Sequence, residues 1–331
     1  MINYVKLEQI IQLLNDSQFH SGSELGAILG LTRGGIWKLI RQLQEIGVEI
    51  EAKTRQGYRL LSPIEFLDRQ IIKSHLSSAH HHYIDQALIF SEIDSTHTRL
   101  VEKVHQSDRS ALLYLAERQT AGRGRMGRPW HSPFARNIML SLLWQANRDL
   151  SELSGLSLVV AIAISQALKR YGVEGVELKW PNDILWQRRK IAGVLIELHS
   201  ELNSSQMLCD VIISFGLNLY LPEPLLSAAD YPITDLATIL KKTPERNKLL
   251  GGLLDELLTT LDKFSQEGLA PFLPLWEELD CAFNAPVNIL MGARTIQGIN
   301  RGVTERGYIR LETHSGEIRS FSSGEVSLQI S

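Results

Sequence analysis

The spacing of apolar residues changes twice along this chain, and the two changes divide it into three parts. Up to Gly47, apolar residues recur at the three- and four-residue intervals of amphipathic helices. From Phe66 to Pro271, strand-like apolar runs are interspersed with long helical ones, as in an α/β domain. From Ala285 onward, short alternating strands are separated by glycine turns, which is typical of a small β-barrel. At 331 residues the chain is long enough for three domains, which we expect over residues 1–62, 66–271 and 283–331.

The first part has the layout of a winged helix-turn-helix domain. Two short amphipathic helices meet at a turn over Gly30–Thr32, where Gly30 can end the first helix and Thr32 can cap the second. Strand-like segments over 48–52 and 57–61 follow as a wing. From Arg33 to Arg59, six basic residues oppose three acidic ones, a local excess of +3 in the part that would face DNA. We expect the second helix to read DNA; the alternative is a winged helix that serves protein contacts.

The middle part is expected to form a mixed sheet with helices packed on it. Its strand candidates cover residues 87–93, 111–117, 137–144, 176–180, 191–198 and 207–219. Its clearest helices cover residues 151–171 and 247–266, the second of which stops at Gly268. The uncharged run from Leu153 to Leu168 is shorter than the roughly 20 residues of a membrane span, so we expect a buried helix and no membrane segment.

A loop rich in glycine and arginine follows the second of these strands. Its segment Gly122–Arg128 spells the G-x-G-x-x-G fingerprint of dinucleotide-binding folds, but Pro129 follows where a helix would have to begin. A P-loop is excluded because it needs Lys-Ser/Thr after the last glycine. The stretch Arg118–Arg136 contains five arginines and no acidic residue, and guanidinium groups bind carboxylates and phosphates in a bidentate manner. We expect the loop to close over an anion, although its spacing alone is equally compatible with a solvated basic loop or a nucleic-acid contact.

Four further polar clusters lie at the ends of predicted strands. They are Ile93–His97, Lys179–Asp183, Arg189–Gly193 and Phe215–Asn218. Each alone is more often structural, as a turn, a surface lysine or a strand bulge. Together they supply hydroxyls, amides, arginines and one lysine but no evident nucleophile, which favours binding and electrostatic catalysis at phosphorus over covalent catalysis.

Composition excludes several other classes of protein. The net charge of −3 gives no general attraction to nucleic acid, so any such contact must come from a local patch. Cys209 and Cys281 match no metal or disulfide pattern and no signal peptide opens the chain, so we expect a cytoplasmic protein. The tract His80–His82, with His75 nearby, could hold a metal. A polar loop is the commoner use of such a tract, and no acidic or cysteine partner lies at ligand spacing, so we expect no metal-binding residues.

Four separated motifs stand in one order along the chain: Ile93–Thr96, Gln119–Arg128, Lys179–Asp183 and Arg189–Gly193. Together they resemble the signatures of the biotin protein ligases, and in particular of the members that also repress the biotin operon. The resemblance extends to the N-terminal winged helix and the C-terminal barrel. It implies an α+β multidomain protein with a winged helix-turn-helix, a mixed-sheet ligase domain like that of the class II synthetases, and an SH3-like β-barrel.

The resemblance implies a two-step reaction. Biotin and ATP with Mg²⁺ would give biotinyl-5′-AMP and pyrophosphate. The biotinyl group would then pass to one lysine of the biotin carboxyl carrier protein of acetyl-CoA carboxylase. A loop that excludes water would protect the mixed anhydride from hydrolysis. The resemblance also implies that the adenylate-bound protein forms a homodimer that binds biotin operator DNA.

The resemblance further implies roles for individual residues of this chain. The implied biotin-binding residues are Ser95, Thr96, His97, Gln119, Gly122, Arg123, Gly124, Arg125, Trp130, Lys190 and Gly193. Those implied for ATP or the adenylate are Arg123, Arg125, Arg128, Lys179, Asn182, Asp183, Lys190 and Asn218. Lys190, Arg125 and Asp183 are implied in catalysis, with Lys190 neutralising charge that develops on the α-phosphate. The residues expected to contact DNA are Ser23, Thr32, Arg33, Trp37, Lys38, Arg41 and Arg55.

Several positions depart from the family pattern. His97 stands where asparagine is usual, Ser214–Gly216 replaces a run richer in glycine, and Tyr231-Pro232 lies where a tryptophan would face the adenine. In the second helix, Gly34-Gly35 and Trp37 replace alanines and an asparagine, which bears on DNA binding rather than on ligation.

Two other classes of protein remain open at this point. A lipoate protein ligase has a related catalytic fold and the same adenylate chemistry, but it usually lacks a winged helix. A ligand-sensing transcription factor without catalysis would have the winged helix but would not need Lys190 or the loop arginines.

Overall fold

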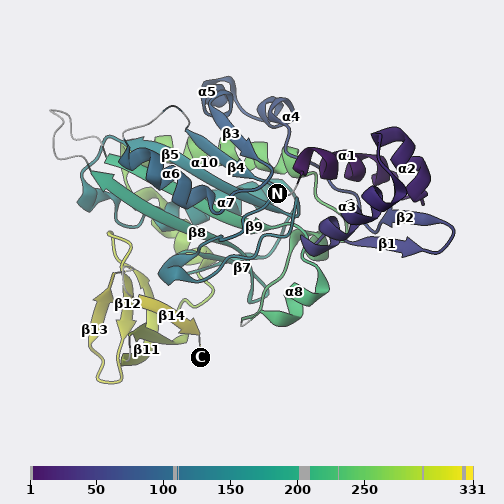
Figure 1. The fold of residues 1–331 in the computed structure, drawn as a ribbon. Helices are drawn as coiled ribbons and strands as arrows, with labels where there is room; N and C mark the ends of the chain where they lie inside the picture. The colour runs from purple at the N-terminus through teal and green to yellow at the C-terminus, as the bar shows by residue number, and fades with distance from the viewer. Residues whose placement is uncertain are drawn as a thin grey trace.

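The computed structural model of the chain describes residues 3–106, 110, 112–200, 209–229, 231–292, 294–322 and 326–330. They form an N-terminal helical unit, a central α/β unit and a C-terminal antiparallel sheet (Figure 1). The N-terminal unit and the C-terminal sheet project from different sides of the central unit (Figure 1). None of the helices in these ranges has the length and apolarity that a membrane span requires.

The N-terminal unit is the predicted winged helix-turn-helix. Its elements are α1 (Tyr4–Leu14), α2 (Gly22–Leu29), α3 (Arg33–Glu45), β1 (Ile50–Lys53) and β2 (Gly57–Leu60). Ser21 begins α2 through a reciprocal capping box with Glu24, and Gly30 ends it in the left-handed conformation at φ 66°. Thr32 caps α3 by accepting a hydrogen bond from the Gly35 amide at 3.1 Å. The turn chemistry that the sequence predicts therefore sets the angle between α2 and α3.

The central unit is built on a mixed sheet. Its strands are β3 (Ala87–Phe90), β4 (Leu113–Ala116), β5 (Asn137–Ala146), β6 (Val176–Lys179), β7 (Asp183–Trp186), β8 (Arg189–Ser200) and β9 (Cys209–Asn218). In the described residues they pair in the order β3-β4-β5-β9-β8-β7-β6, and only the β3–β4 pair is parallel. The sequence predicts six of these strands. It does not predict β7, because its four residues directly follow the turn at Pro181 and are too few to show an alternating pattern.

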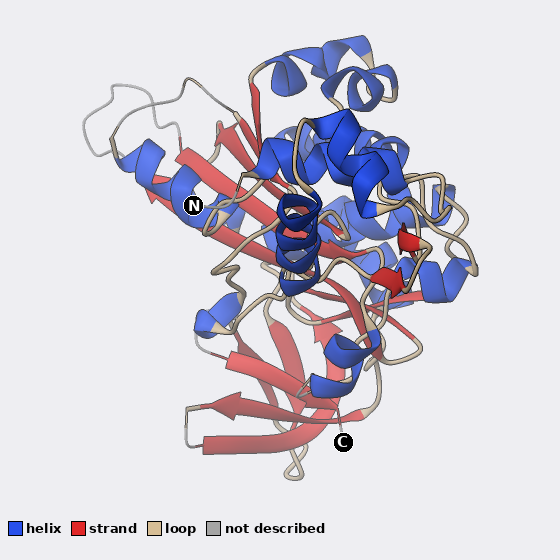
Figure 2. Ribbon diagram, turned by 45° about the vertical axis from the view of Figure 1, so that its right-hand side comes forward, coloured by secondary structure: helices blue, strands red, loops and turns tan. Residues whose placement is uncertain are grey.

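Helices cover both faces of this sheet (Figure 2). On one face α6 (Thr96–His105) packs Leu100 and Val104 against Tyr114 and Ile212. On the other face the two predicted long helices, α7 (Leu156–Arg170) and α10 (Arg246–Glu267), pack against the residues that alternate with these, such as Ile213. The alternation follows from the two-residue period of a strand, which sends successive side chains to opposite faces.

Shorter helices lie around the central unit. They are α4 (Arg69–Ser74), α5 (His81–Asp85), α8 (Glu223–Ala228), α9 (Leu236–Leu240) and α11 (Leu273–Leu279). Buried His80 places its Nδ1 2.7 Å from Asp255 Oδ1 on α10. This contact ties the histidine tract to the long helix, so His80 has a structural role.

The C-terminal sheet has the predicted SH3-like arrangement of antiparallel strands. Its strands are β10 (Pro286–Met291), β11 (Arg294–Val303), β12 (Ile309–Glu312), β13 (Ile318–Phe321) and β14 (Val326–Ile330). In the described residues they pair in the order β13-β12-β11-β10-β14. Val287 and Ile309 join the same apolar core as the central helices, and the Trp180 indole N–H donates to the Gly307 carbonyl at 3.0 Å. The C-terminal sheet is thereby fixed beside the β6–β7 turn.

The arginine-glycine loop is anchored in the core of the winged helix. Phe134, near the end of the loop, is fully buried, and its ring lies 5.8 Å from that of Tyr4 and 6.1 Å from that of Phe66. Arg136 donates to the carbonyl groups of Pro63 at 2.9 Å and Ser62 at 3.1 Å. The loop therefore contacts both the linker and the DNA-binding unit, although it belongs to the central domain in sequence.

Candidate active site

A cavity of about 710 Å³ opens at one end of the central sheet. The start of α6, the arginine-glycine loop, the β6–β7 turn and strands β8 and β9 line it, together with Leu328 and Gln329 of β14. Its volume lies within the range of roughly 300–1,000 Å³ that is usual for small-molecule sites. Among the described lining residues, six side chains are basic and only Asp183 is acidic, so the cavity suits an anion.

Hydroxyl groups form a hydrogen-bonded chain along the floor of this cavity. Ser214 donates to the Ser141 hydroxyl at 2.7 Å, and Ser141 donates to that of Thr96 at 2.8 Å. Thr96 donates in turn to the Gln119 side-chain oxygen at 3.0 Å. Ser95 begins α6 by accepting from the Thr98 amide, so its hydroxyl serves the helix as well as facing the cavity. This floor can bind neutral polar groups of a ligand in a fixed orientation.

Two of the residues that depart from the family pattern, His97 and Ser214, contact each other. His97 Nδ1 lies 2.8 Å from the Ser214 hydroxyl, and its Nε2 lies 3.0 Å from Glu197 Oε2. Burial lowers the pKa of His97 below its ordinary value even though Glu197 acts in the opposite direction. The histidine thus occupies the position as a hydrogen-bonding group, which asparagine would also be.

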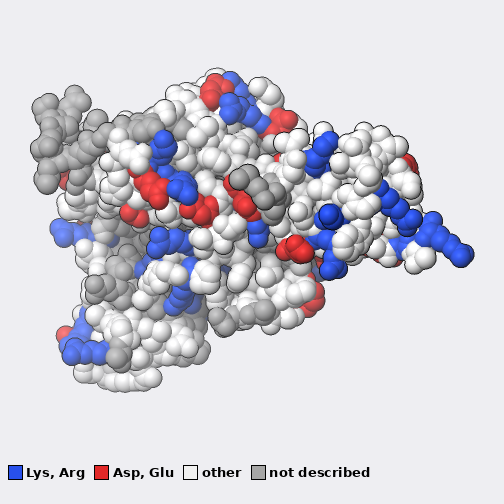
Figure 3. All heavy atoms as spheres, viewed as in Figure 1, with Lys and Arg blue, Asp and Glu red and all other residues white. Residues whose placement is uncertain are grey.

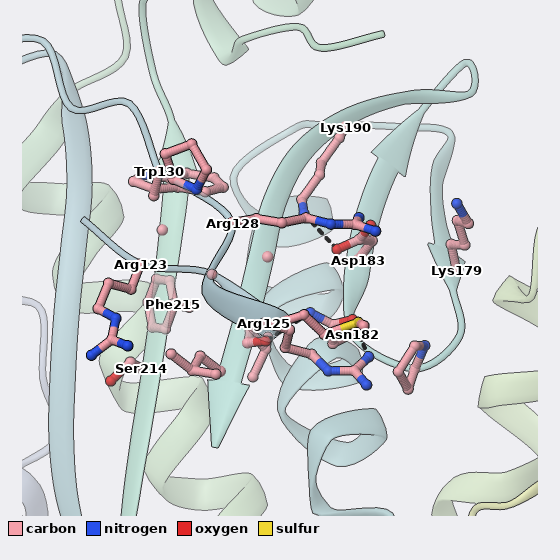
Figure 4. A pocket seen from close by; sticks show the side chains of 18 of the residues that line it. Arg123, Arg125, Arg128, Trp130, Lys179, Asn182, Asp183, Lys190, Ser214 and Phe215 are labelled. Atoms are coloured by element: carbon pink, nitrogen blue, oxygen red, sulfur yellow. Dashed lines mark hydrogen bonds and ion pairs between the residues drawn. The ribbon is translucent and has the colours of Figure 1, made fainter. Parts of the chain in front are cut away.

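Lys190 points into the cavity from the start of β8 (Figure 4). Its Nζ lies 2.6 Å from Asp183 Oδ1, and between the rings of Trp130 and Tyr231, 5.9 and 5.6 Å from their centroids. A Cβ added at Gly193 would lie 3.0 Å from Nζ, so that glycine leaves the ammonium its space. A cation held in this way is positioned to stabilise negative charge that develops on a phosphate.

Three of the five loop arginines line the cavity, and two do not. Arg123, Arg125 and Arg128 reach it, and Arg125 donates to Asn182 Oδ1 at 3.1 Å (Figure 4). Burial lowers the pKa of the Arg125 guanidinium, which nevertheless stays charged at neutral pH. Arg118 instead pairs with Glu92, and Arg136 holds the linker. The loop thus presents charge to the cavity through its middle and is anchored through its ends.

Trp130 covers the cavity by lying on the backbone of β9. A Cβ added at Gly216 would lie only 2.3 Å from the indole Cε2, so glycine is required there for the ring to approach. The indole Nε1 is buried and has no hydrogen-bond partner among the described residues. The indole N–H lies on the side of the ring that packs on Gly216, where an added Cβ would lie 2.7 Å from it.

Three predicted site residues lie at the margin of the cavity. Gly122 packs behind the Trp130 backbone, where an added Cβ would meet the Trp130 carbonyl at 2.7 Å. Lys179 lies at the rim, apart from the other labelled side chains in Figure 4. Asn218 donates its amide to the Thr234 carbonyl at 3.2 Å and lines a small adjoining hollow beside Lys190.

Other lining residues are absent from the sequence-based set. Met126 and Arg188 lie at turns, and Leu328 and Gln329 arrive from a strand at the far end of the chain. No local sequence signal marks the last two, because their place depends on how the C-terminal sheet docks. Tyr231, which lies where the family pattern has a tryptophan, contributes the ring on one side of Lys190.

The residues expected to contact DNA lie on one unit and are all exposed. Their backbones place Ser23 on α2, Thr32, Arg33, Trp37, Lys38 and Arg41 at or along α3, and Arg55 at the tip of the wing. Basic side chains extend along this unit to the wing tip (Figure 3). Trp37 is 52% exposed and Arg41 lies over its ring at 5.7 Å, so a large aromatic side chain stands free on the second helix.

Comparisons with known proteins agree with this architecture. The Biotin/lipoate A/B protein ligase family matches residues 89–215, an HTH domain matches residues 6–59, and the Biotin protein ligase C terminal domain matches residues 282–329. The Bifunctional ligase/repressor BirA of Escherichia coli (strain K12) is 35% identical, over 97% of this chain and 96% of that protein. BirA of Bacillus spizizenii is 30% identical, over 97% of this chain and 98% of that protein. The biotin protein ligase from Aquifex aeolicus in complex with biotin and ATP has a TM-score of 0.62 and 30% identity, over 74% of this chain and 99% of that chain.

The chain therefore belongs to the biotin protein ligase family, with the members that combine a ligase domain and a helix-turn-helix domain. It spans nearly the full length of these relatives. Each of the four motifs on which the resemblance rests contributes residues to this one cavity.

Proposed function

We propose that this chain uses ATP to activate biotin as biotinyl-5′-AMP and then transfers the biotinyl group to a lysine of the biotin carboxyl carrier protein of acetyl-CoA carboxylase. The observation that carries the proposal is the position of Lys190. Its ammonium is held by Asp183 and two aromatic rings at the wall of a cavity that three loop arginines also line. Such an arrangement serves reaction at a phosphate, and the cavity belongs to a biotin protein ligase fold.

In the first step a biotin carboxylate oxygen attacks the α-phosphorus of ATP. The new bond is the carboxyl–phosphate bond of the mixed anhydride, and the bond to the pyrophosphate oxygen breaks. Negative charge grows on the α-phosphate oxygens and on the leaving pyrophosphate. Lys190 and the arginines Arg123, Arg125 and Arg128 supply fixed positive charge on that side of the cavity.

The second step needs the adenylate to survive until a carrier lysine arrives. The lysine amine attacks the acyl carbon, forms an amide and releases AMP and one proton. Until then the loop and the Trp130 ring would keep water out, because Trp130 lies flat on Gly216 and Arg125 is bonded to Asn182. The biotin end would rest on the Thr96 and Ser214 hydroxyls, which line the cavity and are linked through Ser141.

Mg²⁺ would enter this reaction together with ATP, and the residues present fit it. The ion prefers oxygen ligands and is often bound by one or two carboxylates together with substrate phosphates. Asp183 is the one carboxylate among the described lining residues, and the amide of Asn182 is next to it. When bound, the ion would neutralise phosphate charge, and Asp183 would share its oxygens between the ion and Lys190.

We infer that the winged helix binds operator DNA and that the protein does so as a homodimer. A local excess of +3 on a chain of net charge −3 gives weak attraction to DNA, so useful affinity needs two half-sites. The part of β8 from Leu195 to Ser200 pairs with β9 but, within the described residues, with no strand on its other side. A free edge of this kind can pair with a second copy and would place two winged helices on two-fold symmetric half-sites.

Two free cysteines and an ATP-dependent reaction suit the reducing cytoplasm, where we place the protein.

The ligase proposal is tested by incubating the protein with biotin and ATP that carries a radioactive α-phosphate, followed by gel filtration. The proposal expects label to travel with the protein only when biotin is present. Lipoate in place of biotin distinguishes the related ligase class, and it should retain no label. Label retained with lipoate but not with biotin would contradict the proposal.

A further inference from the structure

Two histidines and a glutamate lie close together outside the cavity, where the end of α6 meets the far part of β8. His105 is the last residue of α6, and Glu197 and His199 lie two positions apart on β8, which places them on one face of the sheet. One nitrogen or oxygen atom from each side chain lies within 4.8 Å of the other two. The rings of His105 and His199 meet edge to face with their centroids 4.5 Å apart.

One atom of this cluster is buried without a partner. His199 Nε2 makes no hydrogen bond within the described part of the chain, although it lies 3.1 Å from Glu197 Oε1. Buried polar atoms are nearly always satisfied, and an unpaired one costs free energy. The nitrogen and the carboxylate oxygen can hold a proton between them, or both can bind a metal cation in its place. The two atoms are therefore a ready pair of neighbouring ligands for a cation.

Glu197 is held in place from its other side. Its second oxygen, Oε2, lies 3.0 Å from His97 Nε2, and His97 in turn contacts the Ser214 hydroxyl on the cavity floor. Outer partners of this kind orient the carboxylate ligands of metal ions in proteins. One oxygen of Glu197 thus faces the cavity side, while the other remains directed to the two histidines.

We propose that His105, Glu197 and His199 bind a divalent transition-metal ion, with Zn²⁺ as the favoured ion. Two imidazole nitrogens and one carboxylate oxygen suit Zn²⁺, whereas Mg²⁺ and Ca²⁺ prefer sets made of oxygen alone. With bonds of about 2.0–2.1 Å, neighbouring ligands of tetrahedral Zn²⁺ lie roughly 3.3 Å apart. The 3.1 Å separation of His199 Nε2 and Glu197 Oε1 already fits this geometry. Exposed His105, at the end of its helix, can rotate to complete the set and leave a fourth position for water.

Such an ion would connect α6 to β8 at a point away from the ligand. The first turn of α6 carries Thr96 and His97 on the cavity floor, and β8 carries Lys190 at its start. Because the metal would hold both elements and Glu197 together, Zn²⁺ is expected to stabilise the folded protein. This expectation concerns metal binding alone and does not depend on the ligase activity.

The test is a calorimetric titration of the full-length, metal-free protein with Zn²⁺ and, separately, with Mg²⁺. One Zn²⁺ equivalent should bind, Mg²⁺ should not compete for it, and Zn²⁺ should raise the melting temperature. His105→Asn, His199→Asn and Glu197→Gln should each weaken Zn²⁺ binding by at least about tenfold, since they remove a ligand rather than an outer partner. Glu197→Gln keeps an oxygen that can accept from His97, so it separates loss of the ligand from loss of the His97 contact.

His82→Asn, at the exposed end of the histidine tract, is the matched control and should leave the Zn²⁺ affinity unchanged. Circular dichroism without metal checks that each variant is folded, and exposed His105 provides the mildest change. Absence of a Zn²⁺ site in the wild-type protein would overturn the proposal. So would a site that persists in the folded His105→Asn and His199→Asn variants, or one that disappears in His82→Asn.

Discussion

Replacing Gly216 with alanine should weaken biotin binding and leave the protein folded. A Cβ at this position would lie 2.3 Å from the Trp130 Cε2 and 2.5 Å from Cζ2, which is too close for any real contact. The indole therefore has to move away from β9. The free protein does not need the indole in this position. The bound protein needs Trp130 in place over the ligand, so the clash with the alanine Cβ destabilises the complex.

The size of the effect follows from this difference. Forced overpacking costs about 1–3 kcal/mol when the neighbours must yield. Because about 1.4 kcal/mol changes an equilibrium constant tenfold, the Kd for biotin should rise roughly 5- to 150-fold. Calorimetric titration with biotin measures this Kd directly.

Gly252→Ala provides the matched control for this experiment. Gly252 lies on α10, where an added Cβ meets no atom within 4 Å. The substitution should leave the Kd for biotin unchanged and should stabilise the helix by about 1 kcal/mol. A wild-type Kd in Gly216→Ala would refute the argument that Trp130 lies on Gly216 in the complex.

Four further predictions concern the other parts of the chain. Lys190→Ala should raise the free-energy barrier to biotin-dependent pyrophosphate release by about 3–4 kcal/mol and should change the Kd for biotin less. A near-normal rate of release would show that Lys190 is not needed for catalysis. The Arg125→Gly variant should lose biotinyl-AMP to solution, so that a streptavidin blot detects biotin on unrelated proteins. Labelling confined to the carrier would show that the loop does not retain the adenylate. Burial lowers the pKa of His97, so below about pH 6.5 the unfolded chain takes up a proton more readily than the folded one, and stability falls with falling pH. The free energy of unfolding, measured with urea, should therefore change less between pH 7.5 and 5.5 in His97→Asn than in the wild type. An equal change in both proteins would show that His97 is not the cause of the pH dependence. Finally, biotin with ATP should strengthen both dimerisation and operator binding in sedimentation and gel-shift assays, and equal operator affinity with and without them would disprove the coupling.

The winged helix illustrates what sequence could predict well. Its helix ends depend on local chemistry, namely the Ser21 cap, the left-handed Gly30 and the Thr32 cap, and each lies where the residue type demands it. The same holds for the alternating strands of the C-terminal sheet, whose glycine turns and apolar period are local signals. Strand β7 was beyond this kind of reasoning, because four residues after a proline turn carry no period of their own.

Sequence motifs could place many residues at the cavity, but they could not give the contacts between those residues. Lys190, Asp183 and the three central loop arginines all line the cavity, as the motifs indicate. The contact between His97 and Ser214 depends on how α6 packs against β9, which brings together positions more than a hundred residues apart. The docking of two domains determines that Arg136 holds the linker and that Phe134 lies in the core of the winged helix. Tertiary packing of this kind leaves no mark in local sequence.

In the proposed reaction the cavity makes biotinyl-AMP, keeps it without a covalent bond and delivers its biotinyl group to a lysine. The most direct measurement isolates the protein after incubation with labelled biotin and ATP, and then adds the carrier domain without further ATP. We expect transfer of label to the carrier lysine with release of AMP, and no label on the ligase after denaturation. Transfer that requires fresh ATP, or label that stays on the denatured ligase, would contradict a noncovalently held adenylate.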